Sequence, residues 1–484
     1  MVECPTELTP FEWSMIQGAE NGSMTFAICL GLNGKLDSAA FEAAVASAIA
    51  MHPFLSANIC SQNKTASQKD TAQNNTSERP DQFYWVPVSD PQPYVSIADW
   101  SQPFLYRVSE AIDLSAEIGV RIWVRHGGDE VEIRFQFHHA CCDGLGAFRM
   151  IEDLLRSYSK LAANTEHGST KQDSKLARED ANRLYPLDPD VLSLRTAEPE
   201  AKLSIKNRIL RSTVILPIRI TKLLTQKTAA IVASSSVDKS STEVASLIEL
   251  PSHTFTQELT ESLRSFAKSS GSTLNDLLVR DLFLTIDAWN QASGSKRNRN
   301  IRLLIPFSLR TKKHAQMPAA NCVSMVYMAA NAKLLDDPNA MLASVTRQRK
   351  FIRKWQIEHS WNQTAALASS SRLLSGLVQR RAERPIASSV LTNVGQLFCE
   401  SGLPKMDGKI HCGDLVLNSV VIVPPSEASA PVTFGCNLYA DSLTVALNYH
   451  QRSFPKSDAD RFLSAYVDRL TSSASAGFHI VTQG

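Results

Sequence analysis

A strand hairpin that leads directly into a helix constrains the fold of this chain more than any other segment. Residues 119–139, GVRIWVRHGGDEVEIRFQFHH, alternate apolar and polar side chains on both sides of Gly127-Gly128-Asp129. This pattern predicts two antiparallel strands joined by a tight turn. LGAFRMIEDLLRSYSKL follows at once with helical spacing. The segment therefore indicates an α/β protein in which a short loop joins a strand to a helix.

The loop carries His138-His139-Ala-Cys-Cys-Asp143-Gly144. Because side chains alternate along a strand, we expect His139 to continue the buried apolar row and His138 to join the polar row. The apolar row consists of Val131, Ile133, Phe135 and Phe137. An imidazole at the end of a buried row is costly unless it is paired or used. Its pKa near neutrality lets it accept a proton at working pH, so His139 is the better candidate for a general base.

The start of the following helix adds to this hypothesis. Its N–H groups and positive dipole end lie beside the base, where an oxyanion would form, and Gly144 leaves room for a substrate to approach. Each residue also has a simpler structural interpretation. His139 would be a core histidine bonded to a carbonyl, Asp143 a helix N-cap, and Cys141 and Cys142 small buried residues. The combination of all of them favours a catalytic loop.

Composition and motifs disfavour several other classes of protein. Lys and Arg total 50 against 48 Asp and Glu, and a net charge of +2 gives no reason to expect a nucleic-acid partner. The nine cysteines form no CxxC pair, and His138 and His139 should face opposite ways, so we expect no metal site. No GxSxG elbow of a serine hydrolase is present. Without a signal peptide or a run of ~20 apolar residues, we expect a cytoplasmic protein with reduced thiols.

The length of 484 residues suits two lobes of roughly 200 residues each. We assign 1–161 to an N-terminal lobe, 162–250 to an interlobe connection that lacks clean periodicity, and 251–484 to a C-terminal lobe. Residues 62–81 are polar and predict a disordered surface insertion. In the C-terminal lobe, Thr273-Leu-Asn-Asp276 predicts a helix start. Helices are also expected near 338–356 and 368–382, among strands such as IRLLIPFSLR, NCVSMVYMAA, SSVLTNVG, DLVLNSVVIV, PVTFGCNLY and SLTVALNYH.

One part of the connection, IKNRILRSTVILPIRITKLL, mixes basic and aliphatic residues. Two interpretations stay open. The favoured one is a crossover that covers one lobe. The alternative is an interfacial helix that meets a membrane or an acyl-chain substrate.

The loop sequence resembles a known motif. His138-His139-Ala-Cys-Cys-Asp143-Gly144 matches the HHxxxDG motif of the chloramphenicol acetyltransferase-like superfamily, which includes condensation domains of nonribosomal peptide synthetases, wax ester synthase/diacylglycerol acyltransferases and the BAHD plant acyltransferases. KLDSAAFEAAVASAIAMHPFLSANI, STLNDLLVRDLFLTI, LLIPFSLR with AANCVSMVYM, and LTNVG also resemble segments of these proteins. The resemblance implies an α/β fold of two similar lobes, each a mixed sheet flanked by helices, with an active-site tunnel between them. The DFGWG signature of the BAHD branch is absent, and Ala-Asn321 stands where the family has Gly-Asn.

The resemblance also implies roles for single residues. His139 is implied to deprotonate the acceptor, and Asp143 to pair with Arg310 from the second lobe. Such a pair would fix the loop, and the bidentate guanidinium of arginine suits it. The remaining implied site residues are His138 and Gly144 in support, with Gly144 lining the tunnel, and Asn321 and Asn393 in substrate binding.

The sequence therefore predicts an acyltransferase for acyl groups other than aminoacyl groups. It would move the acyl group from acyl-CoA to a small-molecule alcohol or amine, as a monomer, with the thioester as co-substrate and no other cofactor. Two alternatives stay open. One is a condensation-type enzyme that takes its donor from an acyl carrier protein, and the other is a non-catalytic relative that only binds a partner or metabolite.

Overall fold

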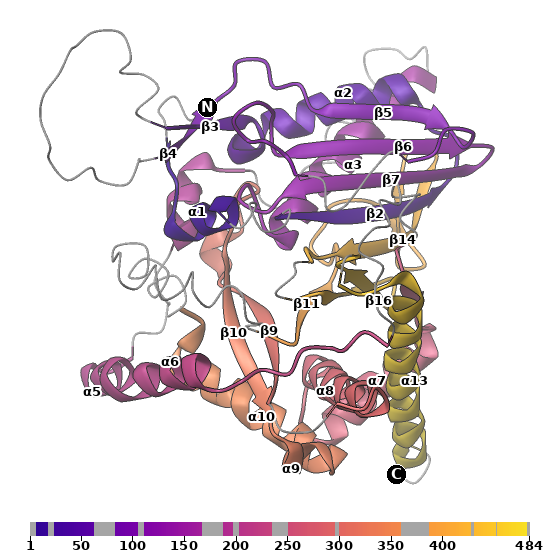
Figure 1. The fold of residues 1–484 in the computed structure, drawn as a ribbon. Helices are drawn as coiled ribbons and strands as arrows, with labels where there is room; N and C mark the ends of the chain where they lie inside the picture. The colour runs from indigo at the N-terminus through magenta and orange to yellow at the C-terminus, as the bar shows by residue number, and fades with distance from the viewer. Residues whose placement is uncertain are drawn as a thin grey trace, which may run out of the picture. The chain divides into compact units, whose positions relative to one another are not determined.

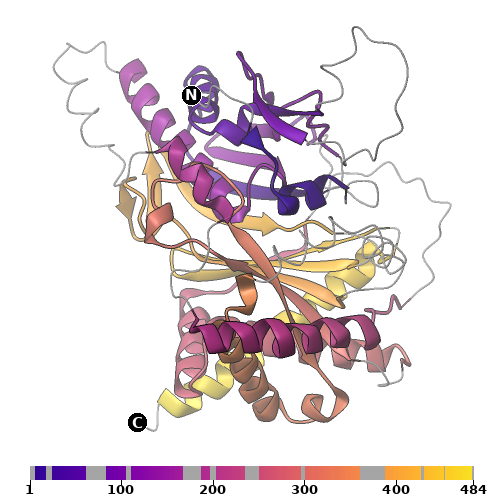
Figure 2. The ribbon, with the colours of Figure 1, turned by 90° about the vertical axis from the view of Figure 1, so that its left-hand side faces the viewer.

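The computed structural model describes residues 6–17, 24–61, 83–104, 111–166, 187–196, 203–234, 250–295, 300–359, 387–426, 430–451 and 453–481. The chain forms two compact units (Figures 1 and 2). Unit 1 comprises Met1–Ala197, Arg310–Cys322 and Phe398–Ser419, and unit 2 comprises Glu198–Leu309, Val323–Leu397 and Val420–Gly484. Two segments that the sequence analysis assigned to the C-terminal lobe, 310–322 and 398–419, thus belong to the unit that carries the histidine loop.

Unit 1 is built on a seven-stranded sheet with the strand order β12-β13-β14-β2-β7-β6-β5. The predicted hairpin is confirmed. β6 (Val120–Gly127) and β7 (Glu130–His138) pair antiparallel, and Gly128 turns between them at φ +61°. The other strands are β2 (Thr25–Asn33), β5 (Tyr94–Asp99), β12 (Lys405–Met406), β13 (Lys409–Cys412) and β14 (Leu415–Val423), which begins in unit 1. β7 is therefore a central strand, held by β2 on one side and β6 on the other.

The helices and a smaller sheet complete unit 1. α2 (Ser38–Ala50) and α3 (Gly144–Glu166) pack against each other. A second sheet has the order β1-β4-β3 and consists of β1 (Thr6–Glu7), β3 (Ala57–Ser61) and β4 (Phe83–Pro87). The short elements are α1 (Pro10–Gln17), η2 (Pro53–Leu55), η4 (Pro189–Thr196) and η6 (Lys312–His314). Fully buried rings such as Phe41, Phe135 and Tyr158 lie in its core.

Unit 2 has a six-stranded mixed sheet with the order β10-β9-β11-β15-β16-β8. β11 pairs in parallel with β9 and β15, and the other pairs are antiparallel. The strands are β8 (Ser252–Thr254), β9 (Ile301–Ser308), β10 (Val323–Ala330), β11 (Ser389–Gln396), β15 (Val432–Tyr439) and β16 (Ser442–Tyr449). Its helices include α7 (Gln257–Ser269), α8 (Leu274–Ala292), α9 (Ala332–Leu335), α10 (Pro338–Trp355) and α13 (Lys456–Val481), with η7 (Ile357–His359) after α10. α8 begins as predicted, with a capping box between Thr273 and Asp276.

The region expected to connect the lobes is structured where it is described. α3 continues to Glu166, past the predicted boundary at 161, and η4 follows at Pro189–Thr196. Residues 205–225 form one helix in three parts: α5 (Ile205–Leu210), η5, a π-turn (Arg211–Ile215), and α6 (Leu216–Thr225). The predicted insertion at 62–81 and the predicted helix at 368–382 lie outside the described residues. No helix in the described ranges has both the length and the apolar character that crossing a bilayer requires.

Candidate active site

The histidine loop is held at both ends by backbone hydrogen bonds. β7 ends at His138, and α3 begins at Gly144. The N–H of His139 donates to the Met24 carbonyl at 2.8 Å, and the N–H of Cys141 donates to the His138 carbonyl at 3.0 Å. At the far end, the N–H of Gly146 donates to Asp143 Oδ1 at 2.8 Å, so Asp143 caps α3. The loop is therefore a fixed turn between a central strand and a helix.

The His139 imidazole has the properties of a base at neutral pH. The residue is half-buried, and its ring lies 5.1 Å from the Phe26 ring, tilted by 58°. Its Nδ1 is buried and has no hydrogen-bond partner among the described residues. Burial lowers the pKa of His139 below its usual 6.5, although the negative charge of Asp143 acts in the opposite direction. The ring is therefore uncharged at neutral pH and able to accept a proton.

His138 is buried in a structural position. Only 3% of it is exposed, and its Nδ1 accepts a hydrogen bond from the Ala140 N–H at 3.1 Å. Burial, with a smaller effect from His139, lowers the pKa of His138 to about 4. His138 continues the row of Glu132, Arg134 and Gln136, as expected from the alternation, but the end of this row is buried, because both faces of β7 are covered there. Gln136, the preceding residue of that row, is also fully buried and donates to Thr25 Oγ1 at 3.2 Å.

This burial predicts a pH-dependent contribution of His138 to stability. Between pH 6.5 and pH 4 the unfolded chain binds a proton at this histidine and the folded chain does not, so the free energy of unfolding falls as the pH falls through this window. His138→Asn keeps an acceptor near the position of Nδ1 but removes the titration. Between pH 7 and pH 4.5, wild type should lose about 2–3 kcal/mol more than the variant in urea unfolding. An equal loss in both proteins contradicts a neutral buried His138.

Asp143 binds two further groups through its second oxygen. Arg310 Nη1 donates to Asp143 Oδ2 at 2.6 Å, and the Cys322 N–H donates to the same atom at 2.8 Å. Arg310 Nη2 also donates to the Ala320 carbonyl at 2.9 Å. Burial alone lowers the pKa of Arg310, but the charge and hydrogen bond of Asp143 outweigh it, so the pKa is raised. Asp143 is thus both an N-cap and an ion-pair partner. The pair lies within unit 1, whereas the resemblance implied an Arg310 from the second lobe.

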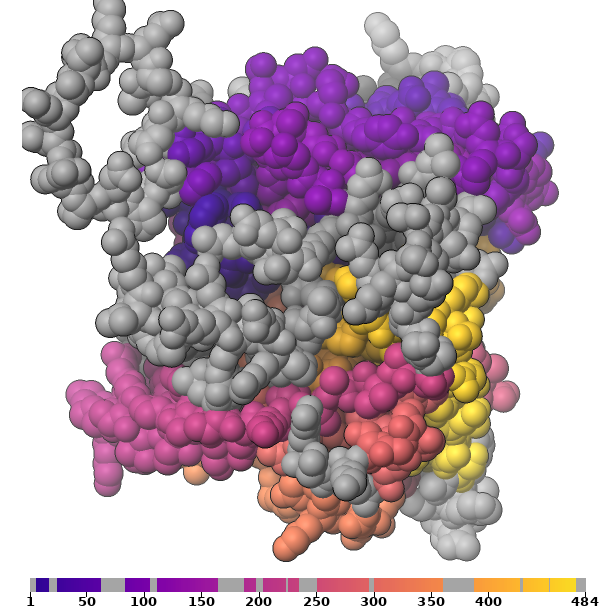
Figure 3. All heavy atoms as spheres, viewed as in Figure 1, coloured from indigo at the N-terminus to yellow at the C-terminus, as the bar shows by residue number. Residues whose placement is uncertain are grey.

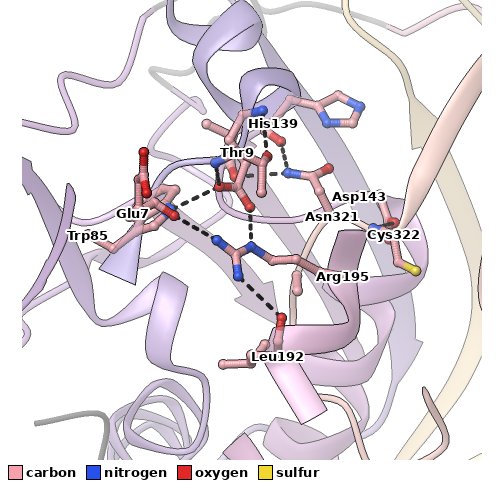
Figure 4. A network of polar contacts seen from close by, with 12 residues as sticks. Glu7, Thr9, Trp85, His139, Asp143, Leu192, Arg195, Asn321 and Cys322 are labelled. Atoms are coloured by element: carbon pink, nitrogen blue, oxygen red, sulfur yellow. Dashed lines mark hydrogen bonds and ion pairs between the residues drawn. The ribbon is translucent and has the colours of Figure 1, made fainter. Parts of the chain in front are cut away.

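Asn321 holds the histidine loop directly. Its Nδ2 donates to the carbonyls of His139 and Ala140, at 2.7 and 2.8 Å. In Figure 4 the His139 imidazole projects away from the carbonyl that Asn321 binds. The amide nitrogen is therefore engaged by the loop, and the predicted role of Asn321 in substrate binding stays a prediction. Asn393 belongs to unit 2, where its Nδ2 donates to Asn275 Oδ1 at 3.2 Å, and its predicted contact with substrate also stays a prediction.

A histidine that the sequence analysis did not single out anchors the segment that carries Asn321. His52 is fully buried, and its Nδ1 accepts from the Ala319 N–H at 3.0 Å. Its Nε2 lies 3.1 Å from Asp153 Oδ2 on α3, so Nε2 carries the proton. Gly146 on α3 also lets the segment 310–322 approach the helix closely, because a Cβ at this position would lie 2.8 Å from the Ala320 carbonyl oxygen. The segment 310–322 is therefore fixed against α3 over several residues.

A second polar network lies in the same view (Figure 4). Glu12 on α1 is fully buried, and its carboxylate accepts from Arg195 Nε at 2.9 Å and from Trp85 Nε1 at 3.3 Å. Arg195 Nη2 donates to the Glu7 carbonyl at 2.8 Å. This network ties η4 to the N-terminal elements of unit 1.

The cysteines of the loop are buried, as predicted. Cys141 and Cys142 have no exposed surface, and burial raises the pKa of both thiols. They are therefore protonated and poor nucleophiles. Within the described ranges, no three His, Cys, Asp or Glu side chains are grouped so as to hold a metal ion.

No family model matches the chain, and no curated protein matches its sequence. Solved structures match it over almost its whole length. The first condensation domain of the calcium-dependent antibiotic synthetase, in complex with a substrate analogue, aligns with a TM-score of 0.64 at 12% identity, over 98% of this chain and 97% of that chain. The chain has the condensation-domain fold.

Two other matches show the range of proteins with this fold. A mutant of the starter condensation domain of rhizomide synthetase, in complex with C8-CoA and Leu-SNAC, aligns with a TM-score of 0.63 at 11% identity, over 97% of this chain and 94% of that chain. The epimerization domain from the third module of tyrocidine synthetase B aligns with a TM-score of 0.60 at 13% identity, over 98% of both chains. These matches confirm the predicted fold class of two lobes with mixed sheets flanked by helices. Because domains named for different reactions share the condensation-domain fold, the reaction has to be argued from the site.

Proposed function

We propose that this protein transfers an acyl group from a thioester donor to an amine or hydroxyl acceptor, with His139 as the general base. The proposal rests on the protonation and the fixed position of His139. This half-buried residue carries a neutral imidazole at the end of a central strand, on a loop fixed by Asp143, Arg310 and Asn321. A fixed neutral base matches a reaction that needs one proton removed from a weak nucleophile.

The reaction balances without a metal or an acyl-enzyme. His139 removes the proton of the acceptor as its nitrogen or oxygen attacks the thioester carbonyl carbon. The tetrahedral intermediate then expels the thiolate, which takes the proton from the imidazolium and leaves as free thiol. At the start of α3, the N–H of Gly146 already donates to Asp143, so this N–H is not available to an oxyanion. In this proposal, positioning of the substrates and proton removal by His139 are the main contributions to catalysis.

The donor is proposed to be an acyl-CoA, with an acyl carrier protein thioester as the alternative. The match to a domain described in complex with C8-CoA and Leu-SNAC supports a thioester site in a protein of this fold. The test is to follow free thiol released from a panel of acyl-CoAs and from matching acyl carrier protein thioesters, with and without amines and alcohols. Acceptor-dependent thiol release from either donor supports acyl transfer. Release from neither donor, with any acceptor, contradicts it.

The lowered pKa of His139 predicts the pH profile of the reaction. General-base catalysis needs the neutral imidazole, and burial holds the pKa of His139 below 6.5. We therefore expect kcat/KM to be flat above about pH 7 and to fall on the acid side with an apparent pKa below 6.5. The measurement is kcat/KM from pH 5 to pH 9 with an alcohol acceptor, because an amine acceptor would add a limb from its own ionisation. A limb that rises through pH 8 or above would assign the base to another group.

A further inference from the structure

Residues 205–225 form a helix on unit 2 with many exposed aliphatic and basic side chains. α5, the π-turn and α6 follow without a break, because the residues at the junctions, Leu210, Arg211, Ile215 and Leu216, all have helical backbone angles. At 1.5 Å per residue the helix is about 30 Å long. Pro217 lies at the start of α6 and has no N–H to donate, and the π-turn lies directly before α6.

One face of this helix is fixed to unit 2. Arg211 is buried, and its Nη1 donates to the Gln356 carbonyl at 3.3 Å. Two turns later, Arg219 Nη2 donates to the Tyr327 carbonyl at 3.0 Å. Ile215 and Leu216, between them, pack against the hydrophobic core of unit 2. This face agrees with the favoured interpretation of the segment as a crossover that covers one lobe.

Many of the exposed side chains of the helix are aliphatic. Ile205, Ile209 and Ile218 are 80%, 57% and 50% exposed. Figure 3 shows the helix (magenta) along the face in view. Six of the eleven large exposed hydrophobic side chains that the structure describes lie in this one helix; the other three are Leu210, Val214 and Ile220. Single exposed aliphatic residues are ordinary, but such a concentration marks an interaction surface.

All charged side chains of this segment are basic. Residues 201–237 contain no Asp or Glu, although acidic and basic residues nearly balance in the whole chain at 48 and 50. Lys206, Arg208 and Lys222 are exposed beside the aliphatic residues. The basic residues of this stretch are Lys202, Lys206, Arg208, Arg211, Arg219, Lys222 and Lys227. A surface that covers this helix must therefore accept aliphatic side chains and carry negative charge.

We propose that residues 205–225 are an interfacial helix through which the protein binds an anionic lipid bilayer. Isoleucine side chains would enter the boundary between headgroups and acyl chains, and the lysine and arginine side chains would bind lipid phosphates. A second copy of the chain fits less well, because two segments with only basic charges repel each other. The helix would lie in the plane of the membrane surface.

The test is co-sedimentation of the full chain with vesicles of pure phosphatidylcholine and with vesicles that contain phosphatidylglycerol in addition. We expect at least tenfold tighter binding to the anionic vesicles, and weakening by salt. Ile209→Ser/Ile218→Ser should weaken that binding by more than tenfold, since each buried isoleucine contributes about tenfold or more. Lys206→Glu/Arg208→Glu should weaken it by about tenfold or more.

Matched variants separate these effects from general changes in charge and hydrophobicity. Lys312→Glu/Lys313→Glu makes the same charge change at exposed positions of unit 1, and Met51→Ser/Met406→Ser removes two exposed apolar side chains elsewhere. Both should bind anionic vesicles like wild type. The proposal is overturned if wild type binds neither vesicle, if it binds both equally, or if the controls lose as much binding as the helix variants. It is also overturned if the lipid-free protein is a dimer that Ile209→Ser/Ile218→Ser dissociates, because the helix would then be a protein interface.

Discussion

Replacing His139 by alanine should lower the turnover of acyl transfer by ~10²–10⁴, the usual contribution of a general base. The fold should survive, because the loop is held by the backbone N–H and carbonyl of His139 and by Asp143 rather than by the imidazole. KM for the thioester should change little, since the proton is removed only in the transition state. The measurement is the steady-state rate of thiol release, with circular dichroism as the check on folding.

The matched control for this prediction is another histidine of the same sheet. His126 lies on β6, at the opposite end of the hairpin from the loop. His126→Ala should therefore keep turnover within about twofold of wild type. If His139→Ala is as active as wild type, His139 is not the base, whatever the behaviour of the control.

The ion pair between Asp143 and Arg310 should show strong coupling in a double-mutant cycle. The Asp143 side chain is 6% exposed and that of Arg310 is 19% exposed, so each single variant leaves a largely buried charge unpaired. Such a loss typically costs ~3–5 kcal/mol of unfolding free energy. Asp143→Asn suits the cycle because an amide oxygen can still accept from the Gly146 N–H, so the cap is kept and the charge is removed. We expect Asp143→Asn and Arg310→Ala each to reduce stability and activity together, and the double variant to be less impaired than the sum.

The alternative for Asp143 is that only its capping bond matters. Because Asp143→Asn keeps the cap, this alternative predicts that the variant costs less than the ~0.5–2 kcal/mol of a lost cap, and that its effect is independent of Arg310. Strictly additive effects on unfolding free energy would show that the pair contributes nothing beyond the cap. The cycle thus separates two roles that the structure places on the two oxygens of one carboxylate.

Local patterns predicted the elements around the site well. The alternation around Gly127-Gly128-Asp129 predicted the β6–β7 hairpin, and Thr273 with Asp276 predicted the start of α8, because both depend on residues a few positions apart. The alternation placed His138 on the row of Gln136 but did not predict that both residues are buried. Whether the polar row of a strand is exposed depends on what covers the sheet, and that information is not in the strand.

The contacts of the site that the sequence did not predict depend on distant segments. Asn321 binds the carbonyls of a loop about 180 positions earlier in the chain, and His52 binds the N–H of Ala319. Neither contact leaves a periodic pattern. Only Gly146 carried a local signal, because a glycine two residues after Gly144, inside a predicted helix, suggests a close backbone approach. Periodicity likewise left two interpretations of residues 205–225 open, because a helix with one docked face and one exposed face satisfies both.

The most direct test of the central claim is to measure both products of the proposed reaction in one experiment. The protein is incubated with octanoyl-CoA and a panel of primary amines and alcohols, and free thiol and octanoylated acceptor are quantified together, the latter by mass spectrometry. Acyl transfer with His139 as the base predicts equal amounts of thiol and acylated product, formed only when an acceptor is present and lost in His139→Ala. Binding of octanoyl-CoA with neither thiol nor product, for the whole panel and for the matching carrier-protein thioester, would contradict the claim and indicate a protein that only binds its ligand.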